Sequence, residues 1–254
     1  IQAGAFLMIN LYLQLVAGLS TLEAGLRLLP AALAMVGATL AAPRIASRIP
    51  EASVIAAALV ITAAGYLVIW QVGPSGGAST LMVGLVITSV GVGPIVALGY
   101  GLVLGAAPPE KAGSAAAINE TGGEFGIALG IAAIGSLGTV IYRLEMSEAI
   151  PAGVSGNVAD TARESIVGAT SAAADLPSPL ASDLLEAAQS AFATALDPVA
   201  VWSAIALVGL AILAAVTLRR LRPLGAPPPA KEAEAGRLGL KQVSNERGEP
   251  RPRS

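Results

Sequence analysis

Long apolar runs separated by short polar segments dominate the pattern along the chain, and residues 52–109 contain no Asp, Glu, Lys or Arg. An α-helix needs about 20 residues to cross the hydrocarbon core of a bilayer, which is about 30 Å thick. The apolar runs have this length. The pattern therefore predicts six membrane-spanning helices, at residues 2–18, 25–46, 52–71, 79–106, 112–142 and 198–218.

The connection at residues 143–196 is too long for a simple turn and shows helical periodicity on both sides of an LPSP break. Ser178 before Pro179 fits an N-cap followed by proline at the first helical position. A stripe of apolar residues follows at four-residue spacing, typical of one helix face: Leu180, Leu184, Ala188 and Phe192. We expect a helical hairpin here, either a solvated connector or a lid-like element.

The end of the chain changes to Pro, Gly and mixed charge, which predicts a disordered tail. The expected organisation has four parts: five transmembrane helices at 1–142, the hairpin at 143–196, the last transmembrane helix at 197–222 and the tail at 223–254. No initiator Met or basic segment precedes the apolar run at Ile1, so we expect an N-terminal portion to be missing.

Composition supports an all-α membrane protein, because 54% of the 254 residues are hydrophobic and only 13% are charged. The mean hydropathy is +0.72. The chain has no Cys and no His, which excludes disulfides, thiolate nucleophiles, zinc sites built on those residues and His-based catalysis. We predict no enzyme activity, no cofactor and no metal site. Nucleic-acid binding is not expected either, since no basic stripe interleaved with aromatic residues is present.

The distribution of Lys and Arg predicts the orientation in the membrane. Arg219, Arg220 and Arg222 close the last span, and basic residues favour the cytoplasmic side. An even number of spans puts both ends on one side. The C-terminus is therefore expected in the cytoplasm and the hairpin outside.

Two carboxylates interrupt the fifth apolar run, in the stretch NETGGEFGIALG at residues 119–130. Glu120 and Glu124 are one helical turn apart, and a helix that starts near residue 112 places them roughly 12 Å and 18 Å along the span. A central carboxylate costs about 2.5–3.5 kcal/mol on insertion scales, so such residues usually face protein or a wet cavity. Desolvation favours the protonated form of a carboxyl group. The pair is thus a candidate proton or cation site, with Asn119 and Thr121 adding polarity to the cavity wall; the alternative is a hydrogen bond that joins helices.

Glycines mark two further places in the spans. Gly122, Gly126 and Gly130 form a GxxxGxxxG ridge, which is typical of close helix packing. Gly91, Gly93 and Pro94 lie in the fourth run, where packing around a proline kink and hinge motion are both open.

Several stretches together resemble the fourteen-helix drug:proton antiporters of the major facilitator superfamily: GLSTLEAGLRLLPAAL, the segment from GVGPIVALGYG to GTVIYR, and the hairpin. The likeness is greatest to quaternary-ammonium and dye exporters of Gram-positive bacteria. It covers about residues 1–222, and PPEKAGSAAAINETGGEFGIALGIA is its most specific part. The resemblance implies that the six spans are the C-terminal bundle of a major facilitator transporter, with an extracellular helical hairpin before the last span.

The resemblance also implies a function: proton-coupled efflux of lipophilic, often cationic drugs across the bacterial plasma membrane. Glu120 and Glu124 match the acidic positions of that family's penultimate helix. The implied partners are the lipid bilayer, the small-molecule substrate, protons and a missing N-terminal helix bundle of the same protein. Two alternatives stay open: an exporter of a metabolite or self-made antibiotic, and a non-transporting membrane scaffold.

Overall fold

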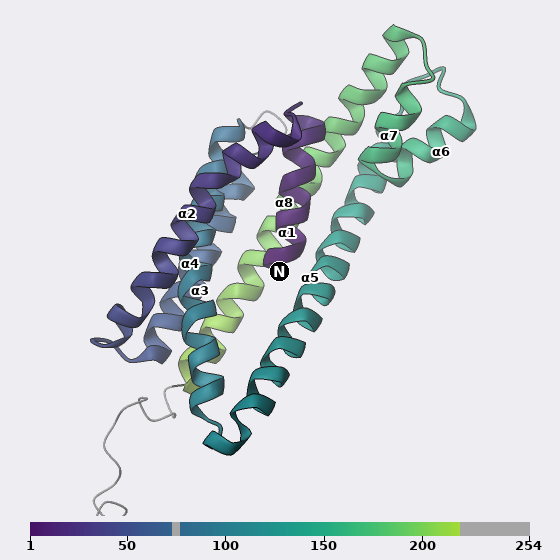
Figure 1. Cartoon of the computed structure of the whole chain (residues 1–254). Coiled ribbons are helices and arrows are strands. Elements are labelled where there is room, and N and C mark those ends of the chain that lie inside the picture. The colour runs from purple at the N-terminus through teal and green to yellow at the C-terminus, as the bar shows by residue number, and fades with distance from the viewer. Residues whose placement is uncertain (73–76, 219–254) are drawn as a thin grey trace, which may run out of the picture. The chain divides into compact units, whose positions relative to one another are not determined.

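The computed structural model describes residues 1–72 and 77–218, and helices dominate this part of the chain (Figure 1). The first half contains α1 (Gln2–Leu11), a π-helix η1 (Tyr12–Val16), α2 (Thr21–Ala46), α3 (Glu51–Ile69), a 3-10 turn η2 (Trp70–Val72) and α4 (Ala78–Gly105). The second half contains a 3-10 turn η3 (Pro109–Lys111), α5 (Ala112–Ala149), α6 (Gly156–Glu164), α7 (Ile166–Ala173) and α8 (Ser178–Leu218). The described helices belong to one unit of the chain, Ile1–Arg220.

Helix length and composition confirm the expected all-α membrane fold. Within the described residues, five segments are long and apolar enough to cross a membrane, and they contain α2, α3, α4, α5 and α8. The run predicted at 2–18 is a shorter apolar helix, Gln2–Val16, and Gly18 follows it with a φ of 66°. A left-handed backbone of this kind suits glycine and cannot continue a helix.

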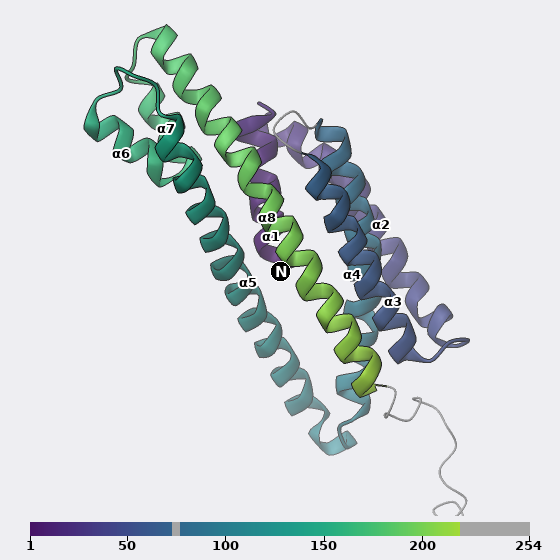
Figure 2. The ribbon, with the colours of Figure 1, turned by 180° about the vertical axis from the view of Figure 1, so that it is seen from behind.

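The helices divide into two groups around α1 and α8. Figures 1 and 2 show α5 on one side of this central pair and α2, α3 and α4 on the other. α4 packs on both α2 and α3, while α8 packs on α3 and α5. Glycine allows α3 and α4 to approach each other closely, because a Cβ added to Gly65 of α3 would overlap Thr88 of α4.

Local sequence explains where α2 begins. The Ser20 hydroxyl accepts a hydrogen bond from the Glu23 backbone N–H at 3.3 Å, and the Ser20 N–H donates to the Glu23 carboxylate at 2.9 Å. This reciprocal pair is a capping box, which satisfies two donors at the exposed helix start. The start of α2 is thus marked in the sequence by a polar cap.

α8 differs from the sequence-based expectation because it continues without a break through residues 196 and 197. The second helix of the expected hairpin and the last span are one 41-residue helix with Pro198 in its interior. Proline removes one backbone hydrogen bond, but α8 packs on both α3 and α5. The tail expected at 223–254 and the end of the last segment, 219–222, lie outside the described residues.

The first half of the segment 143–196 forms two short helices at the end of α5. α6 and α7 meet at Ser165, whose backbone is extended, and the Ser165 hydroxyl accepts a hydrogen bond from the Gly168 N–H at 3.0 Å. α6 is held to α5 by the buried Tyr142 hydroxyl, which donates to the Ala162 carbonyl at 2.9 Å. We refer to α6, Ser165 and α7 as the α6–α7 corner.

Candidate functional site

The two membrane carboxylates lie on α5, which starts directly after the Pro109–Lys111 turn. Glu120 and Glu124 are one turn apart and so share a helix face. Both side chains are exposed in the described chain, and neither forms a hydrogen bond or ion pair there. No other described helix covers them, in contrast to the residues that form the core.

The polar neighbours of this pair differ in their surroundings. Asn119 is half-buried and Thr121 is exposed. The Thr121 hydroxyl donates to the Ala117 carbonyl of its own helix at 2.8 Å, so it makes no bond to another helix. A shallow hollow of about 460 Å³ follows a different face of α5, lined by Ser114, Ala117, Ile118, Thr121, Gly122 and Phe125, and neither Glu120 nor Glu124 is among its lining residues. A membrane helix with an open, partly polar surface of this kind is suited to contact a ligand, water or further helices.

The glycine ridge of α5 packs against another described helix only at its Gly130 end. A Cβ on Gly122 or Gly126 would meet no described atom within 4 Å. Gly130 is buried, and a Cβ there would lie 3.0 Å from the backbone nitrogen of Ile1. α1 crosses α5 at this level, since a Cβ on Gly4 would overlap the Gly130 carbonyl. The half of α5 that carries the carboxylates is therefore the half without close helix contact.

The glycines of α4 contact both neighbouring helices. A Cβ on Gly91 would overlap Thr62 and the Ala58 carbonyl of α3. On Gly93 it would lie 2.7 Å from the Met35 carbonyl of α2. Pro94 is buried inside the same helix, which is continuous from Ala78 to Gly105. These contacts account for the small residues by close approach, and a hinge at Pro94 stays a prediction.

One acidic residue in α8 was not among the candidates drawn from the sequence. Asp197 is half-buried within α8, and its Oδ1 is buried with no hydrogen-bond partner among the described residues. Asp197 lies at the boundary between the expected hairpin, 143–196, and the last expected transmembrane helix, 197–222. The signal in the sequence that could have identified Asp197 is a proline directly after an acid, inside an otherwise helical pattern.

Other polar side chains in the helices are used to join elements. The Tyr66 hydroxyl of α3 donates to Gln2 Oε1 of α1 at 2.9 Å. Gln189 Nε2 of α8 donates to the Leu15 carbonyl in the π-helix at 3.0 Å. These groups are satisfied by their partners, so they differ from Glu120 and Glu124, which the described chain leaves open.

Comparison with known proteins is consistent with this architecture. Residues 1–131 match the family described as the Major Facilitator Superfamily. The chain is also 34% identical, over 217 residues, to the multidrug efflux pump LfrA of Mycolicibacterium smegmatis. That match covers 85% of this chain and 43% of the relative, so the chain spans less than half the length of the protein it resembles.

Proposed function

The chain belongs to the Major Facilitator Superfamily, and we propose that the transporter containing it exports lipophilic, often cationic drugs in exchange for protons. The observation that carries the proposal is the open pair Glu120 and Glu124 on a helix of membrane-crossing length. A carboxylate there is costly, and for this reason its presence indicates a role toward a ligand or a proton. The relative described as a multidrug efflux pump supports the choice of substrate class.

The exposed half of α5 supports a binding site that is formed jointly with helices outside this chain. Transporters of this kind bind substrate near the bilayer midplane, between two helix bundles. We propose that the N-terminal bundle of the complete protein closes the space in front of Glu120 and Glu124. The bundle and its substrate would supply the contacts that the described residues do not.

The two carboxylates are proposed to alternate between two states. In the ionised state, a carboxylate attracts a cationic substrate into the cavity. In the protonated state it no longer does so, and the substrate leaves. Proton binding and cation binding then compete for one group, which couples the flow of one to the flow of the other.

The proposed orientation places the C-terminus in the cytoplasm and the α6–α7 corner outside a bacterial plasma membrane. On α5, Glu120 then lies nearer the cytoplasmic end, since the helix starts at Ala112. We propose that Glu120 captures cations and that Glu124, deeper in the span, exchanges the proton.

The test is efflux of one monovalent and one divalent cationic dye by cells expressing the complete gene. Glu124→Gln should depress export of both dyes, whereas Glu120→Gln should reduce export of the divalent dye more. Glu110→Gln is the matched control, because Glu110 lies in the turn before α5 and is exposed. Membrane abundance is measured for each variant. Unchanged export by the double variant Glu120→Gln/Glu124→Gln would refute the proposal and leave the pair with a packing role.

A further inference from the structure

A small, mostly apolar cavity lies where α1, α5, α8 and the α6–α7 corner meet. Its volume is about 130 Å³, and its walls include Leu7 and Leu11 of α1, Ile166 of α7 and Phe192 of α8. Cavities of roughly 150 Å³ with apolar walls stay dry and bind a benzene ring. This cavity therefore has the size and surface to hold one aromatic ring.

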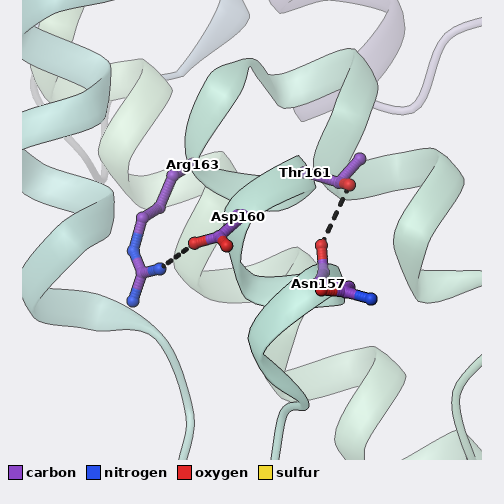
Figure 3. Close-up of polar contacts among 4 residues, drawn as sticks. All are labelled: Asn157, Asp160, Thr161 and Arg163. Carbon is purple, nitrogen blue, oxygen red and sulfur yellow. Dashed lines mark hydrogen bonds and ion pairs between the residues drawn. The ribbon is translucent and has the colours of Figure 1, made fainter.

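The cavity has a single charged lining residue among the described residues, Glu164 at the end of α6. Its side chain is exposed and forms no ion pair within the described chain. The neighbouring cation is engaged elsewhere: Arg163 Nη1 lies 2.7 Å from Asp160 Oδ1, and Figure 3 shows the guanidinium directed to that carboxylate. The rim of the cavity consequently carries a negative charge without a local counter-charge.

The backbone of the α6–α7 corner fixes Glu164 beside the apolar walls. Ser165 is extended and caps α7, which turns the chain sharply after Glu164. Gly168 lies so close to the Thr161 carbonyl that a Cβ would overlap it, and this approach folds α7 against α6. The carboxylate is thus presented by a rigid turn, and less conformational entropy is lost when a ligand binds.

We propose that this cavity is a binding site for a lipophilic monocation with one aromatic ring. The ring occupies the space between Leu7, Ile166 and Phe192, and the cationic head lies at the Glu164 carboxylate. The site is separate from Glu120 and Glu124, and its existence does not depend on transport through that pair. A quaternary ammonium bearing a benzyl group has the required chemistry.

The probe is benzyltrimethylammonium, titrated by calorimetry into the protein encoded by the complete gene, in lipid nanodiscs. The background variant Glu120→Gln/Glu124→Gln is used throughout, so that binding at that pair does not contribute. Neopentylbenzene, in which carbon replaces the ammonium nitrogen, tests whether binding needs the positive charge. Tetramethylammonium, which lacks the ring, tests whether binding needs an aromatic ring in the cavity.

Two variants test the two halves of the site. Glu164→Gln should weaken binding of benzyltrimethylammonium about two- to fivefold, the range expected for an exposed ion pair. Gly135→Leu should weaken it at least about tenfold, because Gly135 lines the cavity and a Cβ there would meet no atom within 4 Å, so the new side chain fills the space. Glu148→Gln and Gly209→Leu are the matched controls: Glu148 is exposed at the end of α5, and Gly209 has open space beside it in α8.

The outcomes are distinct. Equal binding of benzyltrimethylammonium to Glu164→Gln and to its parent would overturn the assignment of the cation. Equal affinity for the neutral probe would show instead that the cavity holds an apolar group such as a lipid chain. If Gly135→Leu does not fold, Gly135→Ala takes its place and should also weaken binding, though less, because its methyl group enters the same space. Unchanged dye export by Glu120→Gln/Glu124→Gln, with intact binding here, would count against the proposed function and not against this site.

Discussion

Removing one oxygen atom, in the variant Tyr142→Phe, tests how α6 is anchored to α5. The Tyr142 side chain is 2% exposed, and its hydroxyl donates to the Ala162 carbonyl at 2.9 Å. The substitution keeps the ring, which contacts Phe192 edge-to-face with centroids 6.3 Å apart. It leaves a carbonyl without this donor in a buried position, since Ala162 is 0% exposed.

The expected cost is about 1–3 kcal/mol, the penalty for leaving a buried polar group without its partner. This cost falls on the attachment of α6 and not on the whole fold, because α3, α4 and the rest of α8 do not contact the altered bond. Protection of the α6 amides against hydrogen exchange should therefore fall by about 5- to 150-fold. Protection in α3 should be unchanged.

The assay is hydrogen-exchange mass spectrometry on the complete protein in nanodiscs, comparing peptides from 156–173 with peptides from 51–69. Tyr100→Phe is the control, because Tyr100 is 44% exposed and the same atom is removed without a buried partner. Unchanged exchange in α6 of Tyr142→Phe would refute the reasoning, since α6 would then be held by its apolar contacts alone. A uniform increase over all peptides would show that the bond supports the entire fold.

Two further predictions concern packing and orientation. Gly91→Leu should reduce the yield of folded protein, because even a Cβ would overlap α3 there. Gly99→Leu should be tolerated, since a Cβ at Gly99 meets nothing within 4 Å. Size-exclusion profiles compare the two variants, and equal profiles would contradict the packing argument. A cysteine at Ser171, which is exposed on α7, should react with an impermeant maleimide in intact cells, while a cysteine at Ser244 should not. Labelling only at Ser244 would reverse the proposed orientation.

Hydropathy alone predicted most helices well, because the bilayer sets their length. The runs expected at 25–46 and 79–106 correspond to α2 (Thr21–Ala46) and α4 (Ala78–Gly105). The same reasoning failed at Asp197 and Pro198, where an acid and a proline look like a helix end. Packing on α3 and α5 keeps α8 intact there, and no local pattern contains that information.

The candidate site also depends on contacts between helices that the sequence does not reveal. Glu120 and Glu124 were visible in the sequence as charges in an apolar run, but their surroundings depend on helices that meet only in space. The cavity beside Glu164 was not visible at all. Its walls come from four separate parts of the chain, from Leu7 to Phe192, and most of the wall residues look like ordinary apolar positions in their own helices.

The continuity of α8 has a mechanical consequence. At about 1.5 Å per residue, its 41 residues form a rod of about 60 Å, twice the thickness of the hydrocarbon core. Pro198 lies near the midpoint, so each half is a lever arm of about 30 Å. A tilt of about 10° around this point displaces the Ser178 end by about 5 Å, the pitch of one helical turn. Because Phe192 forms a wall of the cavity, any such tilt of the spans would change the width of a pocket that lies far from Glu120 and Glu124 along the helices.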